Sequence, residues 1–395
     1  MTGTHTKTLR VDSVDFIDVG GLLSPEERLI RDTVRGFVNT RILPNVAEWF
    51  EEGTLPRELG RELGALGVLG MHLDGYGCPG ASAVAYGIAC MELEAGDAGV
   101  RSFASVQGSL AMYAIHRWGD EAQKQRWLPA LARGEAIGCF GLTEHDFGSN
   151  PGGMRTFARR DGSDWIVDGT KMWITNGSIA DVAIVWAQTD AGIRGFVVPT
   201  DTRGFGASNI HRKLSLRASV TSELVLQDCR LPAEAVLPQA RGLGGPLGCL
   251  NEARYGIVWG AMGAARACYE TALDYAKTRV QFDRPIGGFQ LTQEKLVNML
   301  LELNKGTLLA LHLGRMKDQG RLAPSQVSFG KLNNVREALA IAREARTVLG
   351  ANGVTLEYPV IRHMNNLESV LTYEGTSEMH TLVVGKEITG LDAFT

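Results

Sequence analysis

Residues 165–177 read Trp165-Ile166-Val167-Asp168-Gly169-Thr170-Lys171-Met172-Trp173-Ile174-Thr175-Asn176-Gly177 and predict β structure in the middle of the chain. The stretch is rich in β-branched and aromatic residues, and it contains two dipeptides typical of turns, Asp168-Gly169 and Asn176-Gly177. The run Ala183-Ile184-Val185-Trp186 has a similar composition. We therefore expect a mostly β segment from about Cys139 to about Pro238.

Helical patterns lie on both sides of this β segment. Ser24-Pro25-Glu26-Glu27 supplies an N-cap, a proline at the first helical position and a capping-box glutamate, which predicts the start of a helix. Further helical spacing covers residues 57–66, 83–94, 105–118 and 120–132. After a glycine-rich linker at residues 242–246, it covers residues 250–277, 291–317, 325–349 and 378–388. This order predicts a multidomain α+β chain with a helical N-terminal domain at residues 1–138, a central β domain at 139–243 and a C-terminal helical bundle at 244–395.

The composition argues against several classes of protein. With 395 residues, the chain has room for roughly two to three domains and a large core. Its 40 Lys and Arg against 44 Asp and Glu leave a net charge of −4, so no cationic excess is present to bind nucleic acid. The sequence shows no apolar run long enough to span a membrane and no secretion signal, which predicts a cytoplasmic protein.

The cysteines predict a reduced core rather than a metal site. None of the six belongs to a Cys-x-x-Cys pair, and each stands alone in apolar surroundings. They are Cys78, Cys90, Cys139, Cys229, Cys249 and Cys268.

Residues 75–80, Gly75-Tyr76-Gly77-Cys78-Pro79-Gly80, satisfy the Gly-x-Gly-x-x-Gly pattern of dinucleotide-binding loops. The alternation of strand, helix and strand that such a loop requires is missing around them. The acids downstream, Glu92, Glu94 and Asp97, fall on a helical pattern rather than at the end of a strand. We therefore interpret residues 75–80 as a connecting loop.

Two stretches of the β segment could bind a flat polar ligand. Leu142-Thr143-Glu144 with Gly148-Ser149 ends a strand with hydroxyl donors and a glycine that allows close approach of a ligand, or it is an ordinary β-turn. Trp173 and Thr175 add an indole and a second hydroxyl on a neighbouring strand, or Trp173 is a core residue beside a hairpin turn. The residues alone leave both interpretations open.

Three charged side chains outside the β segment are further candidates. Glu374, in Tyr373-Glu374-Gly375-Thr376, is either a functional carboxylate at a glycine-marked turn or a solvated acid. Arg279 either binds a ligand or stabilises the end of a helix. Arg101, which follows Glu94, either binds a ligand or belongs to a surface cluster of ion pairs.

Taken in order, these motifs resemble the acyl-CoA dehydrogenase superfamily over nearly the whole chain, and within it the glutaryl-CoA dehydrogenases. The motifs that carry the resemblance are Gly75-Tyr76-Gly77-Cys78, Arg101-Ser102 with Ser105-Val106-Gln107, Leu142-Thr143-Glu144 with Gly148-Ser149, Lys171 to Gly177, Gly245 to Gly256, Arg279 to Ile286, Ile361-Arg362-His363, Tyr373-Glu374-Gly375-Thr376 and Ala393-Phe394.

The resemblance implies an FAD enzyme with a helical N-terminal domain, a central β-barrel-like domain and a C-terminal four-helix bundle. The implied contacts to the flavin ring are Phe140, Leu142, Thr143, Gly148, Ser149, Trp173, Ile174 and Thr175, with Thr376 and Glu378 facing the cofactor from the catalytic loop. The implied contacts to the diphosphate and adenine side, supplied across a subunit interface, are Arg279, Phe282, Gln290, Thr347, Leu349, Gly350 and Ala351. No metal site is implied.

The resemblance also implies the chemistry. Glu374 is the expected base that removes a proton α to a thioester, and Tyr373 and Glu94 are expected to assist decarboxylation of glutaryl-CoA to crotonyl-CoA and CO2. Arg101, Ser102 and Ser105 are expected to bind the distal carboxylate, because a buried carboxylate needs a fixed cation and hydroxyl donors. The implied contacts to the CoA arm are Ser149, Leu247, Asn251, Arg254 and Gly375. The implied partners are an electron-transfer flavoprotein as electron acceptor and further copies of this chain in a homotetramer.

The sequence leaves alternatives for the function. The enzyme could oxidise another short acyl-CoA or stop at glutaconyl-CoA, and a flavin-free binding protein on the same scaffold is the alternative from another class. The sequence departs from the family pattern at His145, Asn150, Thr347 and Ala351, where proline, aspartate, glutamine and glycine are usual.

Overall fold

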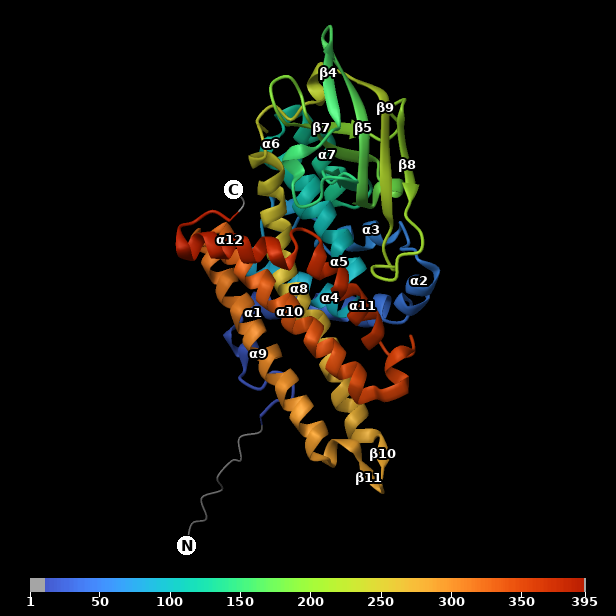
Figure 1. Ribbon diagram of the computed structural model, residues 1–395, viewed down its shortest axis with the longest axis vertical. Helices are drawn as coiled ribbons and strands as arrows, with labels where there is room; N and C mark the ends of the chain where they lie inside the picture. The colour runs from blue at the N-terminus through green and yellow to red at the C-terminus, as the bar shows by residue number, and fades with distance from the viewer. Residues whose placement is uncertain (1–10, 394–395) are drawn as a thin grey trace.

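The computed structural model describes residues 11–393 and has the expected order of a helical, a β and a second helical region (Figure 1). Phe394, half of the closing Ala393-Phe394 motif, lies outside the described residues. The helices of the first region are α1 (Pro25–Phe37), α2 (Val46–Glu52), α3 (Leu59–Ala65), α4 (Ala83–Gly96), α5 (Ala98–Ser105), α6 (Tyr113–Trp118) and α7 (Glu121–Ala132).

Local signals account for several of these boundaries. The Oγ atom of Ser24 accepts a bond from the Glu27 N–H group, and the Glu27 carboxylate accepts one from the Ser24 N–H group. This is the expected capping box, and α1 starts where it was predicted. The helix expected at residues 105–118 instead begins at Ala98, because Asp97 caps α5, and it passes through a π-helical segment, Val106–Met112, into α6.

Residues 75–80 form a small hairpin rather than a nucleotide-binding loop. Strand β1 (Asp74–Gly75) pairs antiparallel with β2 (Cys78–Pro79), and α4 follows directly. No parallel strand pairs with either of them among the described residues. The connecting-loop interpretation is therefore confirmed.

The β region consists of two sheets. One has the order β3-β6-β7, with β3 (Gly138–Gly141) parallel to β6 (Val182–Ala187) and β7 (Arg194–Pro199) antiparallel to β6. The other is antiparallel throughout in the order β4-β5-β9-β8, formed by β4 (Phe157–Asp161), β5 (Asp164–Thr175), β8 (Phe205–Asn209) and β9 (Thr221–Leu231). The Ala158 N–H group bonds to the Gln188 carbonyl at 2.8 Å and joins the sheets at one edge. Side chains of both sheets share one core, which gives the expected barrel-like domain.

Of the two turns predicted in this region, the one at Asp168-Gly169 is absent, and the one at Asn176-Gly177 is present but connects two different sheets. Asp168-Gly169 lies inside β5 as a bulge, where a Cβ on Gly169 would stand 2.5 Å from the Thr156 hydroxyl oxygen, so only glycine fits that close approach. Asn176-Gly177 does not close a hairpin. Asn176 has a left-handed backbone, and the chain then makes a 3-10 turn and crosses to the other sheet.

The second helical region contains three long helices and two shorter ones. These are α8 (Gly244–Thr278), α9 (Gln290–Asp318), α10 (Pro324–Leu349), α11 (Val360–Thr372) and α12 (Ser377–Thr389), with a hairpin of β10 (Val280–Gln281) and β11 (Arg284–Pro285) between α8 and α9. The predicted linker at residues 242–246 is wrong at its C-terminal end, because α8 starts at Gly244. Helix α11, which our sequence analysis did not predict, leads into the Tyr373–Thr376 loop. These helices form the expected C-terminal helical domain (Figure 1).

The two helical regions are held together by close packing of α4 against α8. A Cβ at Gly87 would lie 2.3 Å from the Trp259 ring, and one at Gly263 would lie 1.9 Å from the Met91 carbonyl oxygen, so both contacts require glycine. Glu92 of α4 accepts bonds from Arg266 of α8 at 2.6 and 2.7 Å. Burial raises the pKa of Glu92, but its arginine partners outweigh burial and lower it to about 2, so the pair stays ionised.

Candidate active site

The Tyr373-Glu374-Gly375 turn between α11 and α12 places a carboxyl group inside the molecule. Glu374 has φ 54° and Gly375 has φ 97°, both in the left-handed region. The Thr376 hydroxyl then caps α12 by accepting a bond from the Met379 N–H group at 3.3 Å. The Oε2 atom of Glu374 is buried and has no hydrogen-bond partner among the described residues. Glu374 is therefore not a solvated acid, and its orphaned oxygen can take up a proton.

Burial is the main influence on the Glu374 carboxyl group. It raises the pKa of Glu374, although the positive charges of Arg101, Lys331 and Arg254 act in the opposite direction. A carboxylate with a raised pKa is a stronger base than a solvated one, which suits removal of a weakly acidic proton.

The backbone carbonyls of this turn are bonded to two cations, the half-buried Arg254 and the buried Lys331. Arg254 of α8 donates from Nε to the Glu374 carbonyl oxygen at 2.7 Å, and Lys331 of α10 donates to the carbonyls of Gly375, at 2.6 Å, and Tyr373. Arg254 was expected to contact the CoA arm, but its Nε atom is committed to this turn. Lys331 was missed by our sequence analysis. The available signal was a lysine on the apolar face of a helical pattern, in register with Val327.

Arg101 lies beside the turn, with its side chain fully buried. Its Nε atom donates to Glu94 at 2.6 Å, and its Nη2 atom donates to the Tyr373 hydroxyl. Its Nη1 atom is buried without a partner among the described residues, and so is Oε1 of Glu94. The surface ion-pair interpretation of Arg101 is wrong, because the pair has no solvent exposure. An unpaired buried guanidinium nitrogen is a strong donor for an anionic ligand.

Two serines and a glycine complete this cluster. The Ser102 hydroxyl lies 3.4 Å from the Tyr373 hydroxyl, and the Ser105 hydroxyl is buried and unpaired. A Cβ at Gly260 of α8 would lie 2.0 Å from the Glu94 Oε2 atom. Only glycine at position 260 leaves room for the ion pair between Glu94 and Arg101. The structure therefore brings five of the candidate residues together, namely Glu94, Arg101, Ser102, Tyr373 and Glu374.

The two candidate stretches of the β region are joined at their ends. The Met172 N–H group donates to the Thr143 carbonyl at 2.8 Å. Lys171, which has no solvent exposure, donates to Glu144 at 2.8 Å and to the Leu142 carbonyl at 3.1 Å. Burial lowers the pKa of Lys171 to about 8, and Glu144 opposes that shift. This ion pair, to which our sequence analysis gave no role, fixes the two stretches relative to each other.

The side chains on these stretches differ in accessibility. Trp173 has φ 65° and is 57% exposed, so it is not the core tryptophan of the alternative interpretation. Thr143 and Thr175 are half-buried, and Gly148 and Ser149 are exposed. The side chains of Phe140, Leu142 and Ile174 belong to the core, which leaves their backbone to face a ligand. An exposed indole beside hydroxyls and open backbone fits a flat, polar ring such as a flavin.

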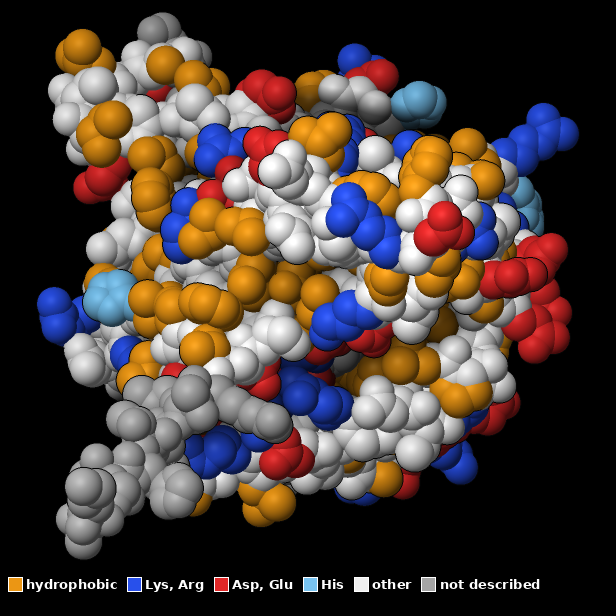
Figure 2. All heavy atoms as spheres, turned by 90° about the horizontal axis from the view of Figure 1, so that it is seen from below, with side chains coloured by type: hydrophobic (Ala, Val, Ile, Leu, Met, Phe, Trp, Pro, Cys, Tyr) orange, Lys and Arg blue, Asp and Glu red, His pale blue; other side chains and the backbone are white. Residues whose placement is uncertain are grey.

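The other group of predicted cofactor residues lies at the far end of the bundle (Figure 1). Arg279, Phe282, Gln290, Thr347, Gly350 and Ala351 are exposed, and Phe282 is 89% exposed. Leu349 is buried in the bundle core, so only its backbone is available to a ligand. Figure 2 looks at this end of the molecule and shows apolar side chains distributed between Lys and Arg side chains. Within one chain, these residues are not in contact with the predicted cofactor residues around Trp173.

The remaining predicted residues lie around the Glu374 turn. Asn251 is half-buried and accepts a bond from Arg254 at 3.2 Å, and Leu247 is exposed one turn earlier on α8. Glu378 is exposed on the first turn of α12. These positions leave Leu247 and Glu378 accessible to a ligand.

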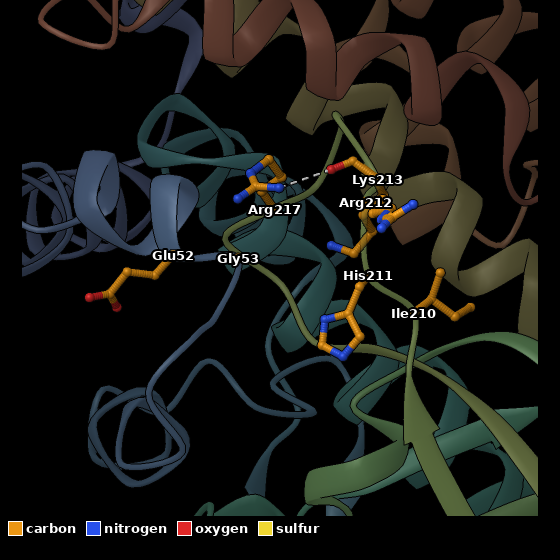
Figure 3. A pocket seen from close by; sticks show the side chains of 7 residues that line it. All are labelled: Glu52, Gly53, Ile210, His211, Arg212, Lys213 and Arg217. Atoms are coloured by element: carbon orange, nitrogen blue, oxygen red, sulfur yellow. Dashed lines mark hydrogen bonds between the residues drawn. The ribbon is translucent and has the colours of Figure 1, made fainter.

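A cavity between α2 and the β8–β9 connection lies apart from this site. It is lined by Glu52, Gly53, Ile210, His211, Arg212, Lys213 and Arg217 (Figure 3). Arg217 donates to the Phe50 carbonyl at 2.7 Å at the end of α2, and Lys213 donates to the Ser219 carbonyl at 2.9 Å. These cations satisfy backbone carbonyls, which is a structural role.

Within residues 11–393, no cluster of three or more His, Cys, Asp or Glu side chains is arranged to hold a metal ion. None of the helices in that range combines the length and apolar character needed to cross a lipid bilayer. All six cysteines are buried free thiols, as predicted.

Comparison with known proteins gives matches along the whole described chain. The family descriptions "Acyl-CoA dehydrogenase, N-terminal domain", "middle domain" and "C-terminal domain" match residues 24–135, 139–229 and 240–389. A structure of glutaryl-CoA dehydrogenase from Mycobacterium smegmatis is 70% identical, with a TM-score of 0.96, and covers 98% of this chain and 100% of its own. A structure of a glutaryl-CoA dehydrogenase from the same organism in complex with FADH2 is 67% identical, with a TM-score of 0.97 and the same coverage. Short-chain specific acyl-CoA dehydrogenase, mitochondrial, of Homo sapiens is 34% identical over 370 residues, which is 92% of this chain and 90% of that protein.

Proposed function

The chain belongs to the acyl-CoA dehydrogenase family and is an FAD-dependent oxidoreductase of that family, and on this basis we propose that it oxidises and decarboxylates glutaryl-CoA to crotonyl-CoA and CO2. The complex of the 67% identical glutaryl-CoA dehydrogenase with FADH2 supports a flavin enzyme over the flavin-free alternative. The observation that carries the choice of substrate is the buried Arg101, whose unpaired Nη1 atom lies in the cluster that contains Tyr373 and the Glu374 turn.

A dicarboxylic acyl group is the substrate that this cluster favours. A carboxylate that enters a site without water loses its hydration, and a fixed guanidinium with nearby hydroxyl donors compensates for that loss. Arg101 supplies the cation, and Ser102 and Ser105 supply the hydroxyls. A simple acyl chain would leave Nη1 of Arg101 buried and unpaired. The two glutaryl-CoA dehydrogenases at 67–70% identity support the same choice.

We assign the proton transfer to Glu374. Its unpaired Oε2 atom takes the proton α to the thioester, and its backbone N–H group donates to the thioester carbonyl. A bound FAD would supply the acceptor for the β-hydrogen, which leaves as hydride. Trp173, Thr143 and Thr175 are the residues that would face its ring. The turn around Glu374 holds the carboxyl group away from water, so the base keeps its raised pKa.

The hydrogen bonds of Arg101 to Glu94 and Tyr373 also support the proposed decarboxylation. When CO2 leaves, the electron pair of the broken C–C bond passes into a dienolate conjugated with the thioester. A proton from Glu374 then converts the dienolate to crotonyl-CoA. Arg101 must then release the carboxylate as the negative charge leaves it. Glu94 and the Tyr373 hydroxyl are both hydrogen-bonded to Arg101, so the guanidinium keeps these partners when the substrate carboxylate is lost as CO2.

Assembly and electron transfer complete the proposal. The Trp173 group of predicted FAD contacts lies in the β region, near the C-terminal end of β5, whereas the Arg279 group lies beside the β10–β11 hairpin at the far end of the helical bundle (Figure 1). One FAD could contact both only if a second copy supplied the Arg279 group, which fits a homotetramer. We propose an electron-transfer flavoprotein as the electron acceptor, as the family resemblance implies.

A second candidate substrate is another short acyl-CoA, which the 34% identity to the human short-chain enzyme favours. The FAD-loaded protein is mixed anaerobically with glutaryl-CoA or butyryl-CoA, and flavin bleaching, CO2 and acyl products are measured. We expect glutaryl-CoA to bleach the flavin and yield CO2 and crotonyl-CoA. Bleaching by butyryl-CoA alone would refute the dicarboxylic substrate, and accumulation of glutaconyl-CoA without CO2 would refute decarboxylation.

The role of Glu374 is tested in the same assay. Glu374→Gln keeps the shape of the side chain and removes its basicity, so flavin reduction should slow by ~10²–10⁴-fold while FAD stays bound. Glu387→Gln, an exposed site on α12, is the matched control and should reduce its flavin at the wild-type rate. In the wild type, reduction should accelerate as pH rises through the raised pKa of Glu374, because only the carboxylate accepts the proton. Wild-type reduction in Glu374→Gln would refute the assignment.

A further inference from the structure

Lys331 is a buried lysine on α10 to which the proposed chemistry gives no role. Its side chain lies among core residues of the bundle, with 1% residual exposure. Its ammonium group donates to the carbonyl oxygens of Tyr373 and Gly375, the residues on either side of Glu374. A lysine is costly to bury, and apolar residues occupy the neighbouring core positions of α10. The placement therefore calls for a specific explanation.

The turn around Glu374 depends on these bonds for its shape. Glu374 is a non-glycine residue with a left-handed backbone, a conformation that persists only where the surroundings impose it. Three consecutive carbonyls of the turn are each bonded to a cation, those of Tyr373 and Gly375 to Lys331 and that of Glu374 to Arg254. Because α8 and α10 supply these cations, the bundle itself sets the direction in which the Glu374 carboxyl group points.

We propose that Lys331 is a positioning residue for the base Glu374: its ammonium group holds the left-handed turn in place and sets a positive charge beside the carboxyl group. The inference rests on the proposed role of Glu374. Lys331 donates to the backbone of the turn and lies 5.8 Å from the centroid of the Tyr373 ring, and no hydrogen bond joins it to the Glu374 carboxyl group among the described residues, so we give it no part in the proton transfer itself. Its effect is on the geometry and the proton affinity of Glu374.

Charged groups from several helices surround this pair. They are Glu94 of α4, Arg101 of α5, Arg254 of α8, Tyr373 at the end of α11 and His380 of α12. Burial lowers the pKa of His380 to about 3, so this histidine stays neutral where the enzyme works. Burial also lowers the pKa of Lys331 to about 7, and the charge of Glu374 opposes that shift. Ionisation of either group therefore favours ionisation of the other.

The test compares Lys331→Met with Lys331→Arg in the FAD-loaded enzyme. Methionine fills a similar volume without charge or donors, whereas arginine keeps both. The titration of Glu374 is followed by the infrared band of its protonated carboxyl group, which is identified as the band missing in Glu374→Gln. Anaerobic flavin reduction by glutaryl-CoA is measured across the same pH range. Lys305→Met, at an exposed lysine of α9, is the matched control.

In Lys331→Met we expect the Glu374 midpoint to rise by about 1–2 pH units, because a nearby positive charge has been removed. The acid limb of flavin reduction should shift with it, and the pH-independent rate should fall by about 10–100-fold because the base is less well placed. KM should change little. Lys331→Arg should keep the midpoint near the wild-type value, and Lys305→Met should match the wild type in every measurement. If Lys331→Met does not fold, the midpoint of Lys331→Gln is measured instead.

The inference and the proposed function fail in different ways. A wild-type midpoint and a wild-type pH profile in Lys331→Met or Lys331→Gln would overturn the role of Lys331. An equal midpoint shift in Lys331→Arg and Lys331→Met would show that the charge is not the cause and would also overturn it. Wild-type flavin reduction by Glu374→Gln would instead refute the role of Glu374 as the base, whatever Lys331 does.

Discussion

Replacing Arg101 by methionine removes the guanidinium group that bonds to Glu94 and Tyr373. Methionine is apolar and similar in length, so the site keeps most of its packing. The bound glutaryl group would then have its distal carboxylate in a buried site without the guanidinium that pairs with it. A monocarboxylic acyl group such as butyryl would not encounter this loss.

The structure sets the size of the expected effect. Removing one partner of a buried, hydrogen-bonded charge pair costs about 2–5 kcal/mol. At about 1.4 kcal/mol for each tenfold change, the preference for glutaryl-CoA over butyryl-CoA in kcat/KM should fall by roughly 30- to several thousand-fold. The loss of Arg101 also leaves Glu94 unpaired. Burial already raises the pKa of Glu94 and Arg101 is the charge that opposes this, so Glu94 should take up a proton and limit the damage to the fold.

The assay measures kcat/KM for glutaryl-CoA and butyryl-CoA in the wild type, in Arg101→Met and in the double variant Arg101→Met/Glu94→Gln. The double variant removes the orphaned acid, so it separates the lost contact to substrate from any disturbance caused by Glu94. We expect both variants to lose preference for glutaryl-CoA to a similar degree. Equal losses for the two substrates would show that Arg101 does not bind the distal carboxylate and would refute the reasoning.

Two further predictions concern the support of the site. Gly260→Ala places a methyl group 2.0 Å from the Glu94 carboxylate oxygen, so the Glu94 carboxylate must move away from Arg101. We expect a lower melting temperature and a reduced preference for glutaryl-CoA, although alanine has the better helix propensity. An unchanged melting temperature and an unchanged substrate preference would contradict this prediction. Lys171→Met leaves Glu144 without its buried cation and should loosen the two stretches that face the flavin, seen as FAD lost during gel filtration. Lys213→Met, which removes a half-buried lysine bonded to a carbonyl and lies away from the site, should retain FAD. Equal loss from both variants would count against a specific role for Lys171.

Local sequence determined much of the secondary structure. The capping box at Ser24 and the β-rich run at residues 165–177 depend on interactions within a few residues, so they could be predicted without knowledge of the fold. Helix α11 was missed, and Asp168-Gly169 was assigned to a turn. The dipeptide is typical of turns, but it forms a bulge inside β5, where Thr156, the residue just before β4, approaches it closely.

The order of the sequence motifs predicted which residues belong to the candidate site, but it did not predict how those residues contact one another. Glu374 and Arg101 were predicted as functional residues from the resemblance, and the packing of α4, α5 and α8 with the turn before α12 then placed them in one buried cluster. Neither the burial of Arg101 nor its unpaired Nη1 atom follows from its neighbours in sequence, because both depend on groups more than a hundred residues away. The sequence alone left a surface ion pair open as an alternative.

By itself the sequence determined the family, the order of the helical and β regions and the candidate base, because these depend on local patterns and on motif order. Only the tertiary structure assigned Lys331 to the Glu374 turn and Gly260 to the ion pair between Glu94 and Arg101. A lysine or a glycine in a helical pattern has many ordinary explanations. Its role is decided by the distance to side chains and carbonyls on other helices, and that distance exists only once the hydrophobic cores have packed those helices together.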